Sequence, residues 1–345
     1  MSNAAAPLVF DGHNDALLRL WKSGQRDAVG RFVSGDGDGH IDLPRAREGR
    51  LGGGLCALYV PSERVLDDNG NFPTPTRDEA LDVTMAQAGL LARIEREAEG
   101  AFSICRTVKD IRNAFAESSF AGVMHLEGAE AITADLDLLY ALYNMGLRTL
   151  GPVWSRPNVF AFGVPFRYPS SPDIGPGLSS FGKALVRSCN ELGIMIDLSH
   201  LNEAGFWDVA KLSDAPLVVS HSNVHAICSH SRNATDRQLD AIRDSGGLIG
   251  INFGVSFLHP EGERDVGMEL SMLTRHVNYI VDRIGIDHVA FGSDFDGTRI
   301  PDAMRDVRDL PKLIAALKAD GYHDGEVEKI AHGNWLRVLQ QTWGG

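Results

Sequence analysis

Histidine and carboxylate side chains recur along this sequence directly after short apolar segments. His13 and Asp15 follow the first of these segments, and Glu127 follows another in MHLEGAE. The set is completed by His200 in IDLSH, His221 in VVSHS and Asp294 in AFGSDFDG. Imidazole nitrogens and carboxylate oxygens are the ligands that Zn²⁺ and similar divalent cations take in proteins. The residue types therefore predict a metal site, provided that the fold brings these positions together.

The apolar segments have the length and composition of buried β-strands. Several, such as LIGINF, are almost wholly apolar, which is typical of parallel strands covered on both faces. Strands are predicted at Pro7–Phe10, Gly54–Val60, Ala121–Leu126, Leu147–Val153, Ile194–Leu198, Leu217–Ser220, Gly247–Phe253 and Val289–Phe291, with a short extra or edge strand at Phe102–Cys105. Amphipathic segments with capping residues predict helices between them at Thr76–Gly100, Leu178–Gly193, Thr235–Gly247 and Ser271–Gly285.

Eight strands that alternate with helices in one chain of 345 residues favour a closed (β/α)₈ TIM barrel, with residues 1–345 as a single domain. An open doubly wound sheet is the alternative, and the dinucleotide-binding version loses support because no GxGxxG follows the first strand. In a barrel the carboxyl ends of all strands meet at one mouth, where active sites lie. The Pro-, Gly- and Ser-rich segment 157–177 predicts a long loop that helps to shape this site.

Each candidate ligand has a structural explanation when it is considered alone. A single histidine at a strand end is usually a hydrogen-bonded structural residue, Glu127 could pair with a cation, and Asp294 and Asp296 could be turn residues. The joint pattern at the ends of five strands favours a metal site. Because six candidate ligands are too many for one tetrahedral ion with an open position, they predict two ions bridged by a carboxylate and a water.

Other polar residues receive less specific predictions. Arg232 follows the sixth strand and is either a surface residue or a clamp for a substrate carboxylate, which a guanidinium binds in a bidentate manner. His125 is expected near the site or in the core, and Asp11 is expected to be structural.

The composition excludes some functions. A formal net charge of −13 and a pI near 5.3 disfavour nucleic acid and anionic membranes as partners. We find no apolar stretch long enough to span a bilayer and no signal peptide. The four cysteines form no CxxC pair, so neither disulfides nor a cysteine zinc site is expected. These features predict a cytoplasmic protein.

At this point the sequence resembles the membrane (renal) dipeptidase family of binuclear zinc peptidases in the amidohydrolase superfamily. The most specific segment is LEGAEAITADLDLLYALYNMGLR, residues 126–148, which matches the family signature. Further matching segments occur in the family's order from about residue 8 to about residue 340: DGHND, GGGLCALYV, IDLSH, SHSNVHAICSHSRN, GINF, GSDFDG and GNWLRV. The resemblance implies a barrel of the metallo-dependent hydrolase type, and it implies that the chain is a bacterial-type member of the family.

The resemblance implies a role for each matching residue. His13, Asp15 and Glu127 would hold one Zn²⁺, and Glu127, His200 and His221 would hold the other, so that Glu127 and a hydroxide bridge the two ions. Asp294 would carry a proton from the hydroxide to the leaving amine, and Arg232 would bind the carboxylate of a dipeptide.

Two positions depart from the mammalian members of the family. Trp154 stands where they carry a histidine that polarises the substrate carbonyl, which leaves Arg156 or Asn158 as other candidates for that role. Gly254 follows Asn252 and Phe253, where they have a tyrosine that helps to hold the carboxylate. We predict that Trp154 and Asn252 contact the substrate.

The predicted function is hydrolysis of L-Xaa-L-Xaa or L-Xaa-D-Xaa dipeptides. One alternative is a binuclear amidohydrolase that acts on another amide, such as an N-acyl amino acid. A second is a metal-binding barrel without catalysis, which the complete set of candidate ligands and Asp294 disfavours. The preferred side chains and the oligomeric state stay open, with a homodimer as the candidate assembly.

Overall fold

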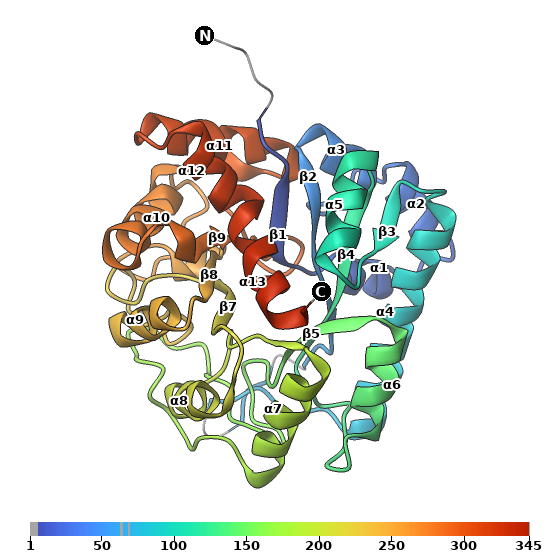
Figure 1. The fold of residues 1–345 in the computed structure, drawn as a ribbon, viewed down its shortest axis with the longest axis vertical. Coiled ribbons are helices and arrows are strands. Elements are labelled where there is room, and N and C mark those ends of the chain that lie inside the picture. The colour runs from blue at the N-terminus through green and yellow to red at the C-terminus, as the bar shows by residue number, and fades with distance from the viewer. Residues whose placement is uncertain (1–5, 63–64, 68–69, 345) are drawn as a thin grey trace.

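The computed structural model describes residues 6–62, 65–67 and 70–344 (Figure 1). Its strands are β1 (Val9–Asn14), β2 (Leu51–Tyr59), β3 (Phe102–Ile104), β4 (Phe120–Glu127), β5 (Leu147–Gly151), β6 (Met195–Ile196), β7 (Val218–Ser222), β8 (Leu248–Ile251) and β9 (Val289–Phe291). Each predicted strand overlaps an observed one. The main difference is at the carboxyl ends of β1 and β7, which extend past the first polar residue, so that His13 and His221 lie within strands rather than after them.

The strands form a closed parallel barrel. One sheet has the order β1-β2-β4-β5-β6 and another the order β7-β8-β9. Parallel bridges join Asp197 to Val218 and Asn14 to Phe295, and these two bridges close the ring. β3 stands outside the ring and pairs with the first residues of β4. The predicted (β/α)₈ barrel is therefore confirmed, with β3 as the predicted extra strand.

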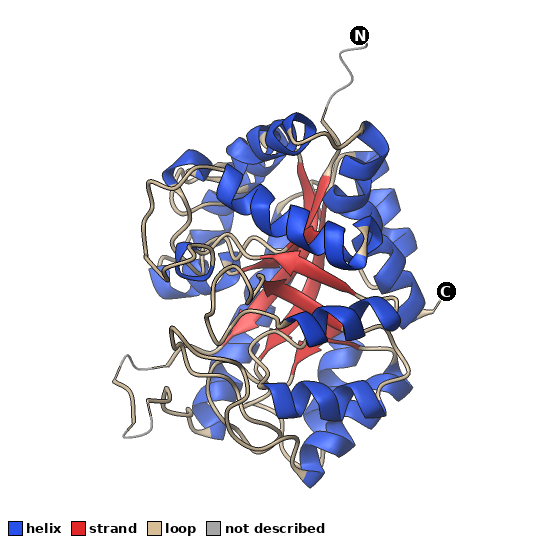
Figure 2. Ribbon diagram, turned by 90° about the vertical axis from the view of Figure 1, so that its left-hand side faces the viewer, coloured by secondary structure: helices blue, strands red, loops and turns tan. Residues whose placement is uncertain are grey.

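Helices surround the barrel, and loops gather at one side of it (Figure 2). The α-helices are α1 (Ala16–Ser23), α2 (Ala28–Ser34), α3 (Leu43–Glu48), α4 (Arg77–Glu97), α5 (Val108–Glu117), α6 (Asp137–Met145), α7 (Ser180–Leu192), α8 (Glu203–Leu212), α9 (Asp236–Asp244), α10 (Ser271–Ile284), α11 (Leu310–Ala319), α12 (Asp324–Glu328) and α13 (Asn334–Trp343). Short 3₁₀ or π turns lie at Val255–Phe257, Ile286–His288, Asp302–Met304, Val307–Asp309 and Lys329–Gly333.

The capping residues in the sequence begin the predicted helices. Thr76 and Glu79 form a capping box at the start of α4, and Thr235 and Gln238 form another at α9. Residues 152–179, between β5 and α7, contain no helix, and Gly163 makes the one bridge in this loop. The predicted long loop is thus observed, and its position beyond the carboxyl end of β5 puts it at the mouth of the barrel.

The indole of Trp335, from α13, fills the barrel interior beside β1 and β9. This side chain is fully buried, packs against Phe10 with ring centroids 6.2 Å apart, and donates from Nε1 to the Phe291 carbonyl at 2.9 Å. Gly12 in β1 leaves the space that the indole needs, because a Cβ at residue 12 would lie 2.3 Å from Trp335 Cζ2 and 2.5 Å from the Ser220 carbonyl oxygen.

Gly12→Ala is therefore expected to lower the free energy of unfolding by about 2 kcal/mol, a typical cost of overpacking a core. Urea denaturation of parent and variant measures the change. Gly89→Ala is the matched control, because Gly89 lies in α4 with no neighbouring atom within 4 Å of its Cβ position. Alanine favours a helix over glycine, so the control should lose no stability. Equal effects of the two substitutions would contradict the steric argument.

Candidate active site

A cavity of about 120 Å³ opens at the carboxyl ends of the barrel strands. It contains most of the residues predicted to do chemistry, together with an aromatic wall. Its lining comprises Asp15, Leu18, Tyr59, Glu127, Trp154, Phe166, His200, His221, Arg232, Phe257, Asp294, Gly297 and Thr298. His13 lies directly beneath, at 3.4 Å from Asp15 Oδ2 and 3.5 Å from Glu127 Oε2. The barrel thus brings together residues that are up to 281 positions apart, from His13 to Asp294.

Glu127, the last residue of β4, lies between the three histidines. Its Oε2 faces His13 Nε2 at 3.5 Å. Its Oε1 faces His200 Nε2 at 3.0 Å and His221 Nε2 at 3.7 Å. One carboxylate oxygen is therefore directed to each half of the site, which is the arrangement that a bridging carboxylate requires.

Two groups of side chains are close enough to share a cation. His13, Glu127 and His221 have ligand atoms within 4.8 Å of one another, and so do His13, Asp15 and Asp294. His200 joins the first group through its 3.0 Å contact with His221, Nε2 to Nε2. All of the predicted ligands therefore converge on one region.

Buried atoms without partners support a metal in this place. Within the described residues, both ring nitrogens of His13 and Oδ1 of Asp15 are buried and make no hydrogen bond. Leaving such groups unsatisfied costs about 1–3 kcal/mol each. Because a divalent cation would satisfy lone pairs on His13 and Asp15 together, the donor set fits Zn²⁺ bound by nitrogen and oxygen.

Hydroxyl groups orient two of the histidines. Ser155 Oγ lies 2.7 Å from His200 Nδ1, and Ser220 Oγ lies 2.8 Å from His221 Nδ1. Ser220 in turn donates to Asp197 Oδ2 at 2.5 Å. These contacts leave both Nε2 atoms directed at Glu127, as partners of metal-binding histidines generally do.

His200 and His221 have the protonation state that binding of a cation requires. Burial, followed by the nearby charge of Arg232, lowers the pKa of His200 to about 3. Burial, followed by His13, lowers the pKa of His221 well below its ordinary value. Both imidazoles are therefore neutral at pH 7, and a neutral imidazole is the form that binds metal.

Asp294 lies just after β9 in a tight turn and borders the cavity. Its Oδ2 accepts a hydrogen bond of 2.8 Å from Asn252 Nδ2. Burial raises the pKa of Asp294 to about 7. The Asn252 Oδ1 accepts from Gly254 N at 2.6 Å, and Asn252 does not line the cavity. The geometry therefore favours a role for Asn252 in holding Asp294 over the predicted contact with substrate.

Arg232 is buried and lines the cavity rather than lying on the surface. Its Nη2 donates to the His221 carbonyl at 2.9 Å, and its Nε makes no hydrogen bond to the described residues. Burial lowers the pKa of Arg232 to about 10, so the side chain stays charged at neutral pH. A buried cation with free donors beside a cavity is suited to bind an anionic ligand.

Trp154 belongs to the aromatic wall of the cavity. Its ring centroid lies 5.2 Å from that of Tyr59, 4.8 Å from that of Phe72 and 5.5 Å from that of Phe166. This wall continues to Phe257, whose centroid is 5.9 Å from that of Phe166. The wall was not predicted from the sequence, because Phe166 and Phe257 come from loops without a motif.

The other two candidates for the role of the mammalian histidine are engaged elsewhere. Arg156 donates to Glu130 Oε1 and to the Val60 carbonyl, each at 2.8 Å. Asn158 donates to the Pro152 carbonyl at 2.8 Å and accepts from the backbone of the same loop. Neither residue lines the cavity. Trp154 is thus the member of this trio that can reach a substrate.

The remaining predictions concern residues around the site. His125 lies beneath His13, with ring centroids 5.5 Å apart and Nδ1 2.9 Å from Thr149 Oγ1. Asp11 accepts hydrogen bonds from the backbone and hydroxyl of Ser293 at 2.6 and 2.7 Å. Both residues support the site from below, as predicted for residues that are not themselves ligands.

The family of the chain follows from a comparison with protein-family models. The model described as membrane dipeptidase, peptidase family M19, matches residues 4–343. The chain belongs to this family. The predicted resemblance is therefore confirmed, and the chain is a hydrolase of the metallodipeptidase class.

Individual members of the M19 family are similar along the whole chain. A metallo peptidase from Rhodobacter sphaeroides, solved with a phosphinate mimic of the dipeptide L-Ala-D-Ala, is 48% identical, with a TM-score of 0.95 over 98% of this chain and 100% of that chain. A second M19 structure, described as dipeptidase AC, is 50% identical, with a TM-score of 0.95 over 99% and 100%. Dipeptidase verJ of Clonostachys rogersoniana is 31% identical over 98% of this chain and 85% of its own length.

The description of the matching family contains the word membrane. In the part of this chain that the structure describes, no helix is both long and apolar enough to cross a bilayer.

Proposed function

We propose that this M19 protein hydrolyses the peptide bond of small dipeptides with two zinc ions. The observation that carries the proposal is the position of Glu127, with one oxygen directed to His13 and the other to His200 and His221. His13 and Asp15 would complete one ion, and His200 and His221 the other. When bound, such a pair of ions supplies an activated bridging hydroxide and polarises the scissile carbonyl.

The protein side chains would then orient the reactants and move the proton. Asp294 borders the cavity within reach of His13 and Asp15, and Asn252 fixes one of its two carboxylate oxygens. The free oxygen would accept the proton of the attacking water and pass it to the nitrogen of the leaving amine. A general acid–base group of this kind must lie within hydrogen-bond reach of the proton that it transfers.

Arg232 supports a dipeptide as the substrate. It lines the same cavity as Glu127, His200 and Asp294, so its guanidinium would bind a C-terminal carboxylate close to the scissile bond. The related Rhodobacter sphaeroides protein was solved with a mimic of L-Ala-D-Ala, which supports including D-residues at the second position. We therefore propose small L-Xaa-L-Xaa and L-Xaa-D-Xaa dipeptides, with the apolar wall of Trp154 and Phe166 against a side chain.

Arg232→Met is expected to raise KM for dipeptides by about 10- to 100-fold, because a charge-assisted hydrogen bond contributes about 1.5–3 kcal/mol. The same substitution should change KM for the matching dipeptide amides, which lack the carboxylate, much less. Steady-state kinetics on each acid and amide pair measures the difference. Arg237→Met is the control, because Arg237 lies on the exposed surface of α9. Equal losses on acids and amides would contradict the clamp.

A stereochemically resolved dipeptide library, tested on protein loaded with two equivalents of Zn²⁺, tests the proposed function. N-acetyl amino acids belong in the same screen, since they keep the carboxylate that Arg232 would bind and lack the free amine. Hydrolysis of dipeptides supports the proposal. Hydrolysis of the N-acetyl compounds alone would replace it with an N-acyl amino acid hydrolase, and no hydrolysis of either class would leave a metal-binding barrel without catalysis.

A further inference from the structure

The turn that carries Asp294 has a backbone conformation that needs support. Asp294 has φ 60° and Asp296 has φ 67°, so two residues with side chains lie in the left-handed region within three positions. Residues with side chains adopt this conformation uncommonly, although aspartate does so more often than most. It persists only where the surrounding structure fixes it.

Asp296 is the point at which the turn is fixed. Its Oδ2 accepts from Arg19 Nε at 3.1 Å, and its Oδ1 accepts from the backbone N of His40 at 2.5 Å. Its own backbone N donates to His40 Nδ1 at 2.8 Å. The carboxylate is 1% exposed, so these contacts are shielded from water. They also occupy Asp296, which is therefore not available as a metal ligand.

Arg19 connects this turn to the segment that carries Asp15. It lies one helical turn after Asp15 in α1, with Arg19 N bonded to the Asp15 carbonyl at 3.1 Å. The two segments are also joined directly, by Asp15 N to the Phe295 carbonyl at 2.8 Å and by Asp294 N to the His13 carbonyl at 3.0 Å. A displacement of Asp296 would thus be transmitted to both Asp15 and Asp294.

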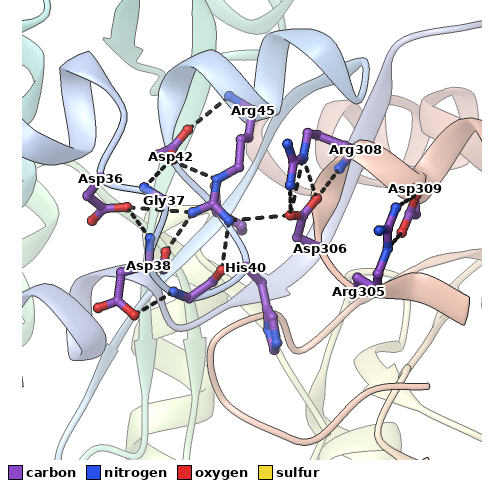
Figure 3. Close-up of polar contacts among 12 residues, drawn as sticks. Asp36, Gly37, Asp38, His40, Asp42, Arg45, Arg305, Asp306, Arg308 and Asp309 are labelled. Atoms are coloured by element: carbon purple, nitrogen blue, oxygen red, sulfur yellow. Dashed lines mark hydrogen bonds and ion pairs between the residues drawn. The ribbon is translucent and has the colours of Figure 1, made fainter. Parts of the chain in front are cut away.

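Polar contacts around Arg45 hold the loop that presents His40 (Figure 3). Arg45 donates to the carbonyls of Gly39 at 2.8 Å and Asp38 at 2.6 Å, and Arg19 donates to Asp36 Oδ2 at 2.7 Å. Gly39 has φ 58°, and a Cβ there would lie 2.4 Å from both Arg19 Cδ and Asp296 Oδ1. At Gly39 the loop therefore packs closely against both Arg19 and Asp296.

We propose that Arg19, His40 and Asp296 form a positioning clamp, which sets the carboxylates of Asp15 and Asp294 at the distance that a shared metal centre and water require. The inference rests on the proposed function. The clamp residues do not line the cavity. They act on catalysis through the two segments that they join, the turn with Asp294 and the start of α1 with Asp15. Misplacement of reacting groups by about 1 Å can cost about 10²-fold in rate, so a small shift of the turn would be visible in kcat.

Asp296→Asn and Arg19→Met test the clamp. Each should lower kcat about tenfold or more while KM for the dipeptide stays within about twofold, because the carboxylate site at Arg232 is untouched. Residues that orient metal ligands typically contribute about 10- to 100-fold to metal affinity. Zn²⁺ titration against a chromophoric chelator should therefore show one of the two ions bound about tenfold more weakly. This second readout does not depend on catalysis.

Asp309→Asn is the matched control. Asp309 is another buried aspartate that pairs with an arginine, at 3.2 Å from Arg305 Nε, and in the described part of the chain its ion pairs involve neither the His40 loop nor the Asp294 turn. It should keep the parental kcat and both zinc affinities. If Asp296→Asn does not fold, His40→Ala replaces it. This change keeps the backbone bond from His40 N to Asp296 Oδ1, removes the bond from Asp296 N and the ring contact with Phe295, and should lower kcat about threefold.

Parental kcat and zinc affinity in folded Asp296→Asn would overturn the clamp, and so would losses in Asp309→Asn as large as those in Asp296→Asn. These outcomes differ from a failure of the proposed function. If the parent hydrolyses dipeptides, Asp294→Asn does not, and Asp296→Asn behaves as the parent, then only the clamp is contradicted and the proposed function stands. If the parent hydrolyses no dipeptide, the proposed function fails, and the zinc titration still decides whether the clamp positions Asp15.

Discussion

Glu127→Gln is expected to remove at least one of two zinc equivalents and to lower kcat at least about 10³-fold, since a metal pair supplies several kcal/mol of transition-state stabilisation. Glutamine keeps the size of the side chain but has no charge and one oxygen in place of two. In the parent, the two oxygens face different histidines, at 3.5 Å for His13 and 3.0 Å for His200. The amide can satisfy one side of this arrangement and not both.

Metal analysis by mass spectrometry and thermal unfolding with and without chelator measure this effect. A ligand that binds the folded state stabilises it, so chelator should lower the Tm of the parent much more than that of Glu127→Gln. Glu130→Gln is the matched control, because Glu130 is another buried glutamate, paired with Arg156 at 2.8 Å outside the cavity. It should lose stability and keep both ions. Two ions and near-parental kcat in Glu127→Gln would contradict the bridging role.

The main part of the candidate site could be predicted because the positions of strand ends in the sequence are enough to locate it in a parallel barrel. All strands run in the same direction, so a polar residue at any carboxyl end reaches the same mouth, whichever strand pairs with which. His13, Glu127 and His200 satisfy this condition, and the structure brings both histidines to the carboxylate of Glu127. Hydropathy placed the ends of β1, β4 and β7 too early, since buried polar residues such as His221 interrupt an apolar pattern without ending the strand.

The parts that were not predicted depend on contacts between loops. Phe166 comes from the long loop after β5 and Phe257 from the turn after β8, and no periodicity or motif places their rings together. The ion pair of Arg19 and Asp296 joins residues 277 positions apart. The role of Asn252 was also assigned differently, because a buried amide and a substrate-binding amide have the same sequence signal. Such features depend on side-chain packing, which one sequence does not encode in a local pattern.

Asp294→Asn is expected to lower kcat by about 10²- to 10⁴-fold, which is the usual contribution of general acid–base catalysis. The asparagine keeps the shape of the side chain and can still accept the hydrogen bond from Asn252, which is 2.8 Å long in the parent. It cannot take up a proton. KM for a good dipeptide should therefore change little, because Arg232 and the aromatic wall remain in place.

Zinc content separates two roles that Asp294 could have. Its carboxylate lies near His13 and Asp15 and is close enough to share a cation with them. If Asp294 carries the proton, Asp294→Asn keeps two zinc equivalents while it loses turnover. Glu127→Gln, in contrast, is expected to lose turnover and at least one zinc equivalent. Asp302→Asn provides the control, since Asp302 is an exposed aspartate after the same strand. Loss of zinc from Asp294→Asn would identify Asp294 as a metal ligand. Parental turnover would show that Asp294 takes no part in catalysis. Zinc content and kcat, measured on the same variant, therefore distinguish the two roles.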